Sequence, residues 1–374
     1  MEDSRTIAKN IGKVYYHIYR NKTSSRQAIA SSLGFSLPTV THYLNRLRES
    51  ELIYNAGEFE STGGRKANML SVVPHARFAG GIDITQSYVA FVLIDLNLNI
   101  LQRVKIHKKY ENTELYYQQI GREIEELINL QGIDREHFLG VGVSLPAIVG
   151  EGQNRVDYAE VINVPDNLYE RMKEWIPYPL LMFNDANSAG WAELWMRGDN
   201  HPMAYLSLSN SVGGAIVMNR KVYTGVNWRA AEFGHMTVIP WGKKCYCGSY
   251  GCLNSYCSAC VLSDFTNGDI GEFFWQMKMT GNRGYRNVFE EYMKHLALAV
   301  NNLRMCFDCD VVLGGNVGGY MEEYLEEFKK LACDLNPYED TADYIKTGLC
   351  RTEPSAVGAA LYFIDDFVRS PKHI

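Results

Sequence analysis

The feature that most constrains this chain is a group of metal-binding residue types between residues 232 and 252. Glu232-Phe-Gly-His235 is followed, ten residues after the histidine, by Cys245-Tyr-Cys247-Gly-Ser-Tyr-Gly-Cys252. Three cysteines and one histidine supply four soft ligands, the number that a closed tetrahedral zinc site requires. Four protein ligands leave no open position for water, so we predict a structural zinc ion held by His235, Cys245, Cys247 and Cys252. The alternative is a set of reduced, buried cysteines beside an unrelated histidine.

Size and composition favour a cytoplasmic protein of several domains. At 374 residues, 46% hydrophobic and 21% charged, the chain is long enough for two or three domains with a sizeable core. No apolar run approaches a membrane span, and the first residues lack the pattern of a secretory signal. Seven of the nine cysteines lie in three short-spaced groups, which is more typical of metal ligands in a reducing cytosol than of a disulfide framework.

The net charge of −6 is unevenly distributed along the chain. Residues 1–75 contain ten Lys and Arg against six Asp and Glu, a balance of +4, so the remaining residues carry −10. A basic head on an acidic body indicates that only the head meets a polyanion.

Three helical patterns precede residue 55 and have the spacing of a helix-turn-helix. They cover residues 5–20, 24–33 and 36–47, and the third begins with a candidate N-cap at Ser36 and a proline in its first turn. One face of the third pattern is apolar, and the other carries groups that hydrogen-bond to phosphates or base edges. We predict DNA contacts from this face, at Pro38, Thr39, Thr41, His42, Asn45 and Arg46.

A basic hairpin follows the helices and predicts a wing. Residues 52–54 and 69–72 have the composition of two strands, and the segment between them contains Arg65 and Lys66, which could reach the DNA backbone or minor groove. The alternative is a small helical docking or dimerisation module.

The remainder of the chain alternates strands with helices, which predicts an α/β fold. A strand-turn-strand pattern at 78–96 returns at 203–218. Helical patterns cover 113–130 and roughly 287–305, and buried strands cover 139–144, 180–183 and 310–313. The repeated hairpin predicts two similar lobes with a ligand cleft between them.

Several of these motifs together resemble the ROK family of repressors and sugar kinases. They are Glu232-x-Gly-His235 with its cysteine motif, Asn184-Asp185-Ala-Asn187 and the strand end Leu313-Gly-Gly315. The resemblance covers about residues 78–360, and residues 1–72 resemble the DNA-binding head of the repressor branch. It implies an actin-like (ribonuclease H-like) pair of α/β lobes that bind a sugar between them.

The resemblance also implies roles for single residues. The family's sugar contacts fall on Asn184, Asp185, Glu232 and His235, and in its kinases the residue matching Asp185 is the base that deprotonates the sugar hydroxyl. We add Asn254 to the ligand-binding set, because it stands where the sugar kinases have a glutamate after Gly-Cys-Leu/Ile. An amide there changes an acceptor into a donor and acceptor.

Departures from the family pattern favour a regulator over an enzyme. The first phosphate loop of the kinases resembles Asp-x-Gly-Gly-Thr, where this chain has Asp83-Ile-Thr85-Gln86-Ser87. The second resembles Gly-Thr-Gly, where this chain has Ser209-Asn210-Ser211. Backbone N–H groups approach a triphosphate closely at glycines, so we expect ATP binding, and with it catalysis, to be lost.

The combined prediction is a DNA-binding repressor that responds to a sugar effector. Its expected partners are double-stranded operator DNA and the sugar, and we expect a homodimer or homotetramer with no membrane association. The alternatives are an ATP-dependent sugar kinase with a DNA-binding head, in which Asp185 would be catalytic, and a repressor controlled by a protein partner.

The predicted domains are 1–74 for the winged helix-turn-helix, 75–195 for the first lobe and 196–374 for the second. The second lobe would contain the zinc site and a dimerisation surface, and the C-terminal helix would be free to pack back on the first lobe. Two further pairs, Cys257/Cys260 and Cys306/Cys309, are expected to be buried thiols.

Overall fold

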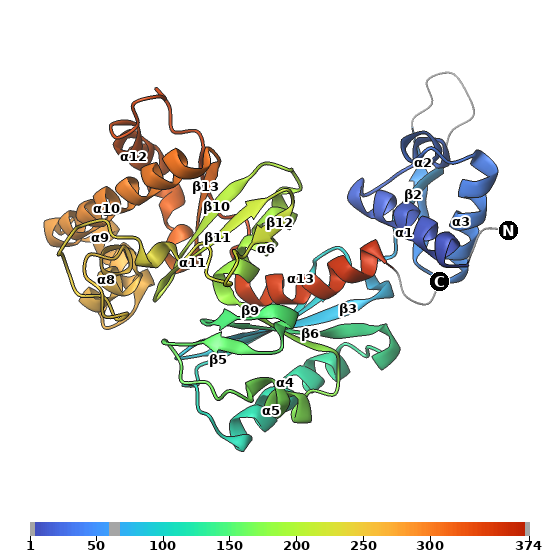
Figure 1. The fold of residues 1–374 in the computed structure, drawn as a ribbon, viewed down its shortest axis with the longest axis horizontal. Coiled ribbons are helices and arrows are strands. Elements are labelled where there is room, and N and C mark those ends of the chain that lie inside the picture. Colours follow the sequence, from blue (N-terminus) through green and yellow to red (C-terminus); the bar gives the residue numbers. More distant parts are fainter. Residues whose placement is uncertain (1–3, 60–67, 371–374) are drawn as a thin grey trace.

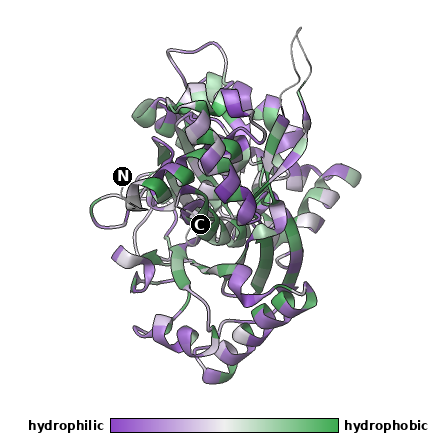
Figure 2. Ribbon diagram, turned by 90° about the vertical axis from the view of Figure 1, so that its right-hand side faces the viewer, coloured by the Kyte–Doolittle hydropathy of each residue, from purple (hydrophilic) through white to green (hydrophobic). Residues whose placement is uncertain are grey.

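A computed structural model describes residues 4–59 and 68–370 of the chain. These residues form a small helical head and a body with two five-stranded sheets, and two helices lie between the sheets (Figure 1). The strands are mainly hydrophobic, while many helices carry hydrophilic residues on their outer faces (Figure 2). None of the helices described is both long enough and apolar enough to cross a membrane.

The head has the predicted helices, and their ends are defined by local capping. The Ser25 hydroxyl accepts a hydrogen bond from the N–H of Ala28, and Gly34 closes the same helix in the left-handed conformation at φ 69°. The Ser36 hydroxyl caps the next helix by accepting from the N–H of Thr39. The elements are α1 (Ser4–Arg20), α2 (Arg26–Leu33), α3 (Leu37–Glu49), β1 (Ile53–Glu58) and β2 (Asn68–Val72).

The two strands of the head pair antiparallel, with Ile53 opposite Val72, and they form the predicted wing. Inside the head, the apolar face of α3 is buried through Val40, Leu44 and Leu47. The wing residues Arg65 and Lys66 lie outside the described residues.

The first lobe has the strand order β5-β4-β3-β6-β9. The strands β3, β4 and β5 form an antiparallel meander, and β6 and β9 add to it in parallel. A two-stranded hairpin, β7 with β8, extends from this lobe. The elements are β3 (Phe78–Ile84), β4 (Val89–Asp95), β5 (Ile100–Ile106), α4 (Glu114–Leu130), β6 (Phe138–Leu145), β7 (Ile148–Val149), β8 (Val156–Tyr158), α5 (Leu168–Trp175) and β9 (Leu180–Asn184).

The second lobe repeats this topology as β12-β11-β10-β13-β14, again a meander followed by two parallel strands. The repeated hairpin in the sequence therefore reflects two lobes of the same design. The elements are β10 (Met203–Leu208), β11 (Val212–Met218), β12 (Lys221–Tyr223), α7 (Asn254–Cys257), α8 (Cys260–Ser263), α9 (Ile270–Met279), α10 (Arg283–Phe307), β13 (Asp310–Gly314), α11 (Gly315–Gly318), α12 (Met321–Cys333) and β14 (Ile345–Thr347).

Two helices, α6 (Asp185–Arg197) and α13 (Pro354–Arg369), join the lobes. α13 follows the last strand of the second lobe but packs against β3 and β6 of the first, and against α6. This packing requires glycines, because a Cβ atom at Gly142 would overlap the backbone of Ala359, and one at Gly358 would overlap the backbone of Ser188.

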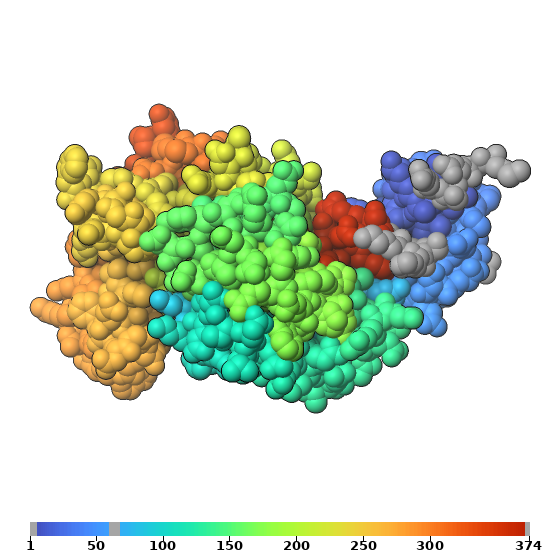
Figure 3. All heavy atoms as spheres, turned by 60° about the horizontal axis from the view of Figure 1, so that its bottom comes forward, coloured from blue at the N-terminus to red at the C-terminus, as the bar shows by residue number. Residues whose placement is uncertain are grey.

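The head docks on the outer ends of these two helices. The Tyr15 ring lies edge-on to Phe367 of α13, and the Tyr19 ring lies edge-on to Trp195 of α6. The Tyr19 hydroxyl also donates to the carbonyl of Leu96, at 2.7 Å. The head and both linking helices share one hydrophobic cluster, and the surface view shows α13 (red) lying between the head (blue) and the lobes (Figure 3).

Candidate functional site

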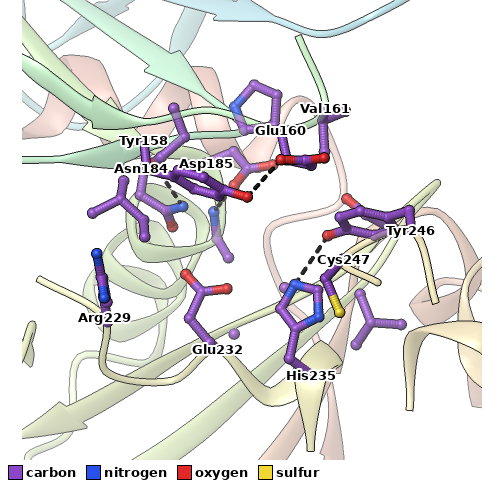
Figure 4. Close-up of a pocket in the computed structure, with 18 residues that line it drawn as sticks. Tyr158, Glu160, Val161, Asn184, Asp185, Arg229, Glu232, His235, Tyr246 and Cys247 are labelled. Carbon is purple, nitrogen blue, oxygen red and sulfur yellow. Dashed lines mark hydrogen bonds between the residues drawn. The ribbon is translucent and has the colours of Figure 1, made fainter. Parts of the chain in front are cut away.

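A cavity of about 350 Å³ lies between the two lobes, and its walls come from both. The first lobe contributes the β7–β8 hairpin and the end of β9, and the second contributes the start of β11 and the loops after β12 (Figure 4). The lining includes four of the five residues predicted to bind ligand, namely Asn184, Asp185, Glu232 and His235. Its volume lies in the usual range for small-molecule sites.

Asn184 and Asp185 reach the cavity from the junction of β9 and α6. The Asn184 amide caps α6, because its Oδ1 accepts from the N–H of Asn187 at 2.9 Å while its Nδ2 donates to the carbonyl of Ala147 at 3.1 Å. Burial raises the pKa of Asp185 to about 6, and the nearby carboxylate of Glu232 acts in the same direction. The backbone N–H of Ala186 donates to Asp185 and opposes this rise.

Glu232 precedes a short 3-10 helix, Phe233–His235, that lies against β11, and His235 is its last residue. Gly234 permits this approach, since a Cβ atom there would overlap the backbone of Val212. Burial raises the pKa of Glu232, and the charges of His235 and Arg229 partly oppose that rise. The Nε2 of His235 lies 3.2 Å from the Tyr246 hydroxyl, on the cavity side.

The four predicted metal ligands come together beside the cavity. One ligand atom from each of His235, Cys245, Cys247 and Cys252 lies within 4.8 Å of the other three, so the group could hold a metal ion. Gly248 and Gly251 both have left-handed φ angles, 86° and 79°, which turn the chain back on itself between the cysteines. Cys247 also lines the cavity, so the metal group and the cavity share a wall.

Asn254 does not line the cavity, and its predicted role as a ligand contact needs correction. The residue begins α7 and is buried, and its Oδ1 accepts a hydrogen bond of 2.8 Å from the N–H of Val212. Val212 lines the cavity, so the Asn254 amide supports the wall from behind it.

Four lining residues with aromatic or charged side chains were not predicted from the sequence: Tyr158, Glu160, Arg229 and Tyr246. Tyr246 stands between two predicted metal ligands, and that position could have identified it. The other three lie at or beyond strand ends where no periodic pattern marks them. The Tyr158 hydroxyl donates to the Glu160 carboxylate at 2.5 Å.

A second cleft is lined by Asp83 and Ser209, one residue from each segment that matches a phosphate loop. The Thr85 hydroxyl accepts from the N–H groups of Ser87 and Tyr88, and the Ser209 hydroxyl accepts from the N–H of Asn316. Arg103 and Lys105 both contact the Glu353 carboxylate, at 2.9 and 3.4 Å. The cations of this cleft are therefore paired within the chain.

The predicted DNA-contacting residues share the outer face of α3. Pro38, His42, Asn45 and Arg46 are exposed, and Thr39 and Thr41 are half-buried. The Thr41 hydroxyl donates to the carbonyl of Leu37 and accepts from Arg26 of α2, so it also joins the two helices.

The remaining predicted cysteines and tryptophans are structural for the most part. Trp191 is buried in the core and does not line the cavity. Cys257 and Cys309 are buried as predicted, but Cys260 is half-buried and Cys306 is exposed. Cys306 lies near the end of α10 with its side chain exposed, so its predicted burial was wrong.

Comparisons with known proteins agree with this architecture. The model of the ROK family matches residues 79–366, and a model of winged helix-turn-helix DNA-binding domains matches residues 8–54. Together these matches confirm the predicted fold class, a winged head followed by a two-lobed sugar-kinase fold.

Among curated proteins, the xylose repressor of Bacillus spizizenii is 28% identical over 263 residues, which cover 69% of this chain and 68% of that protein. The N-acetylmannosamine kinase of Salmonella arizonae is 28% identical over 292 residues, covering 75% of this chain and 96% of the kinase. Among solved structures, a ROK family transcriptional regulator, described as a homolog of the E. coli MLC protein, superposes with a TM-score of 0.76 and 18% identity over 98% of both chains.

Proposed function

The chain belongs to the ROK family, and on that premise we propose that it is a sugar-responsive, DNA-binding transcriptional repressor. One observation carries the proposal: a polar cavity between the lobes and a winged helix-turn-helix head lie at opposite ends of the same helix, α6. The relatives named xylose repressor support the same function.

The cavity has the chemistry that a sugar requires. Asp185 and Glu232 offer carboxylate oxygens to ligand hydroxyls, and His235 offers a ring nitrogen. Asp185 is half-buried, so few waters compete with a ligand hydroxyl for its carboxylate. We assign these three residues the main sugar contacts, and we assign Asn184 the role of orienting the first turn of α6.

We propose that the metal group binds zinc through the Nδ1 of His235 and the three cysteine sulfurs. Two Zn–S bonds of about 2.3 Å at a tetrahedral angle separate their sulfur atoms by about 3.8 Å, and Cys247 and Cys252 have sulfurs 3.8 Å apart. The Nδ1 of His235 lies at the same distance from the Cys245 sulfur. Zinc bound there would fix the orientation of His235, leaving Nε2 for the sugar in place of the Tyr246 hydroxyl.

Communication between cavity and DNA is proposed to run along α6. Ligand contacts act on Asp185 in its first turn, and Trp195 in its last turn touches Tyr19 of the head. The Glu193 carboxylate also accepts from the N–H groups of Leu349 and Cys350, which tie α6 to the segment leading into α13. A sugar that binds one lobe arrangement more tightly would then bias the position of the head.

A sugar kinase is the second candidate, because Asp185 lies in the cavity and the N-acetylmannosamine kinases are relatives. A carboxyl with a pKa of about 6 is suited to take a proton from a hydroxyl. Against it, the N–H groups of Ser87 and Tyr88 in the first phosphate-loop segment are engaged by Thr85. The cations of the second cleft are also paired within the chain. Phosphoryl transfer depends mainly on such donors and cations.

One experiment separates the two functions. DNA from the chain's own upstream region, labelled for fluorescence anisotropy, is titrated with the protein, with and without a panel of hexoses, pentoses and N-acetylated amino sugars. We expect salt-sensitive DNA binding that one sugar changes by tenfold or more, and no ATP consumption with any of them. DNA binding that is absent at low salt would contradict the repressor; ATP turnover that disappears in Asp185→Asn would establish the kinase.

A further inference from the structure

One cationic side chain, the exposed Arg229, lines the cavity between the lobes, and a ligand with only neutral hydroxyls gives it no charged partner. Arg229 is the only Lys or Arg among the residues that line it. Within residues 4–59 and 68–370, no carboxylate lies in ion-pair distance of its guanidinium and no hydrogen bond engages it, although three carboxylates, Glu160, Asp185 and Glu232, line the same cavity. An unpaired guanidinium at a ligand site is a strong anion receptor, because its planar fork matches carboxylate and phosphate oxygens.

The backbone around Arg229 is held in one conformation. Trp228 and Ala231 on either side both have left-handed φ angles, 60° and 63°, which non-glycine residues rarely adopt. The N–H of Ala230 donates to the carbonyl of Thr224 at 3.1 Å, and Gly214 lets the carbonyl of Ala231 lie close against β11. Arg229 therefore starts from a defined point on the cavity rim, as a binding residue requires.

The guanidinium lies on one side of the cavity and the metal-linked wall on the other. Figure 4 shows Arg229 beside Glu232, opposite His235 and Tyr246. The pKa of Glu232 is raised by burial, and the positive charges of His235 and Arg229 partly oppose that rise. A sugar whose hydroxyls contact Asp185, Glu232 and His235 would direct the substituent on its far side toward Arg229.

We propose that the effector is a sugar bearing an anionic substituent, a carboxylate or a phosphate, and that Arg229 selects it by a bidentate contact. This inference rests on the proposed sugar-sensing function. The three carboxylates of the cavity repel an anion elsewhere in it, so the charged end has one favourable position, and Arg229 sets the orientation of the ring as well as the choice of ligand.

The test uses the full-length protein and compares its affinity for neutral sugars with its affinity for their charged derivatives. Isothermal titration measures the dissociation constants of glucose, galactose, mannose and N-acetylglucosamine against their 6-phosphates, and of the three hexoses against their uronic acids, with inorganic phosphate as the anion alone. We expect at least one acid or phosphate to bind about tenfold or more tightly than its neutral parent. The uronic acid and the phosphate arms distinguish the two anions.

Variants assign the preference to Arg229. Arg229→Gln should weaken the charged ligand about 10- to 100-fold while changing its neutral parent less than about threefold, and Arg229→Lys should recover part of the loss. Arg122→Gln, an exposed change on α4, is the matched control and should change neither ligand. Circular dichroism checks that each variant is folded.

The outcomes separate the inference from the function on which it rests. Neutral sugars that bind as tightly as their acids and phosphates, in the wild type and in Arg229→Gln alike, would overturn the inference and leave sugar sensing intact. An absence of binding by every ligand would overturn both. Binding of inorganic phosphate as tight as that of the sugar phosphates would also overturn it, because the sugar would then contribute nothing.

Discussion

At the scale of single residues, His235 connects the metal group to the ligand cavity. Its Nδ1 faces the Cys245 sulfur, and its Nε2 faces the Tyr246 hydroxyl at the cavity wall. One imidazole can serve both environments because its two nitrogens point in opposite directions. Loss of the metal should therefore be felt in the cavity as well as in the cysteine loop.

Cys247→Ser should remove the metal and destabilise this part of the second lobe. We expect zinc content to fall from one equivalent to near zero, a Tm lower by several degrees, and a weaker ligand response, because metal binding contributes to folding free energy. Cys306→Ser is the control, since Cys306 is an exposed cysteine outside the group. Elemental analysis and thermal unfolding measure the two effects; full ligand response in a metal-free protein would contradict the proposed role.

Asp83 provides a prediction on pH. Burial, with the charge of Asp185 nearby, raises the pKa of the Asp83 carboxyl from its ordinary value of 3.8 to about 7. The folded chain then keeps a proton that the unfolded chain releases above about pH 4, so this group lowers stability as pH rises from about 4 to about 7. We expect Asp83→Asn to raise Tm by a few degrees at pH 8 and to change it little near pH 4.

Asp166→Asn is the matched control for that measurement, because Asp166 is exposed. The measurement is the Tm of the wild type, Asp83→Asn and Asp166→Asn at pH 4 and at pH 8. If the Tm changed with pH equally in the wild type and in Asp83→Asn, Asp83 would be excluded as the cause of the pH dependence of stability.

At the scale of elements, α6 extends from the ligand cavity to the DNA-binding head. Its first turn lines the cavity, its middle is buried against α13 and β11, and its last turn contacts the head. A rigid helix transmits a displacement along its axis with little loss because its backbone hydrogen bonds are internal. The contact between Trp195 and Tyr19 is the point where that displacement would reach α1.

Trp195→Ala should uncouple the sugar response from DNA binding. We expect the sugar affinity to change less than about threefold, because the sugar site remains. The change in DNA affinity that sugar causes should be mostly lost, because the contact that couples the two sites is removed. Trp175→Ala on α5 removes a similar side chain from the first lobe and should preserve the coupling. Anisotropy titrations with and without sugar measure both; a full response in Trp195→Ala would exclude this route.

At the scale of the whole molecule, charge divides the chain into a basic head and an acidic body. The exposed face of α3 points away from the helices that dock the head. We therefore expect DNA to approach the head alone, and a homodimer or homotetramer would present two heads to one operator at a spacing set by the bodies. Light scattering of the purified protein measures the assembly.

The affinity for operator DNA should fall steeply with salt. Arg46→Gln should reduce the slope of log affinity against log salt by about 0.9 for each phosphate contact that is lost. Arg283→Gln, an exposed arginine at the start of α10, should leave the slope unchanged. Equal slopes in Arg46→Gln and the wild type would mean that Arg46 does not contact phosphate.

Local patterns were sufficient for much of this fold. The cap at Ser36, the wing strands and the repeated hairpin were predicted because they depend on neighbouring residues. β5, β14 and the bounds of α13 were not predicted: β5 and β14 are edge strands with a mixed burial pattern, and α13 is apolar on most faces because it is enclosed by both lobes.

The sequence alone determined the head, the two-lobed design and the metal group, because each follows from short-range spacing or from a compact motif. The tertiary structure was needed for Arg229, Tyr158 and Glu160, which reach the cavity from loops far apart in the chain. It was also needed for Asn254, whose amide oxygen accepts a hydrogen bond from Val212, and for the docking of α1 on α6 and α13. Such contacts depend on how the lobes meet, and no local pattern encodes the direction in which a loop side chain points.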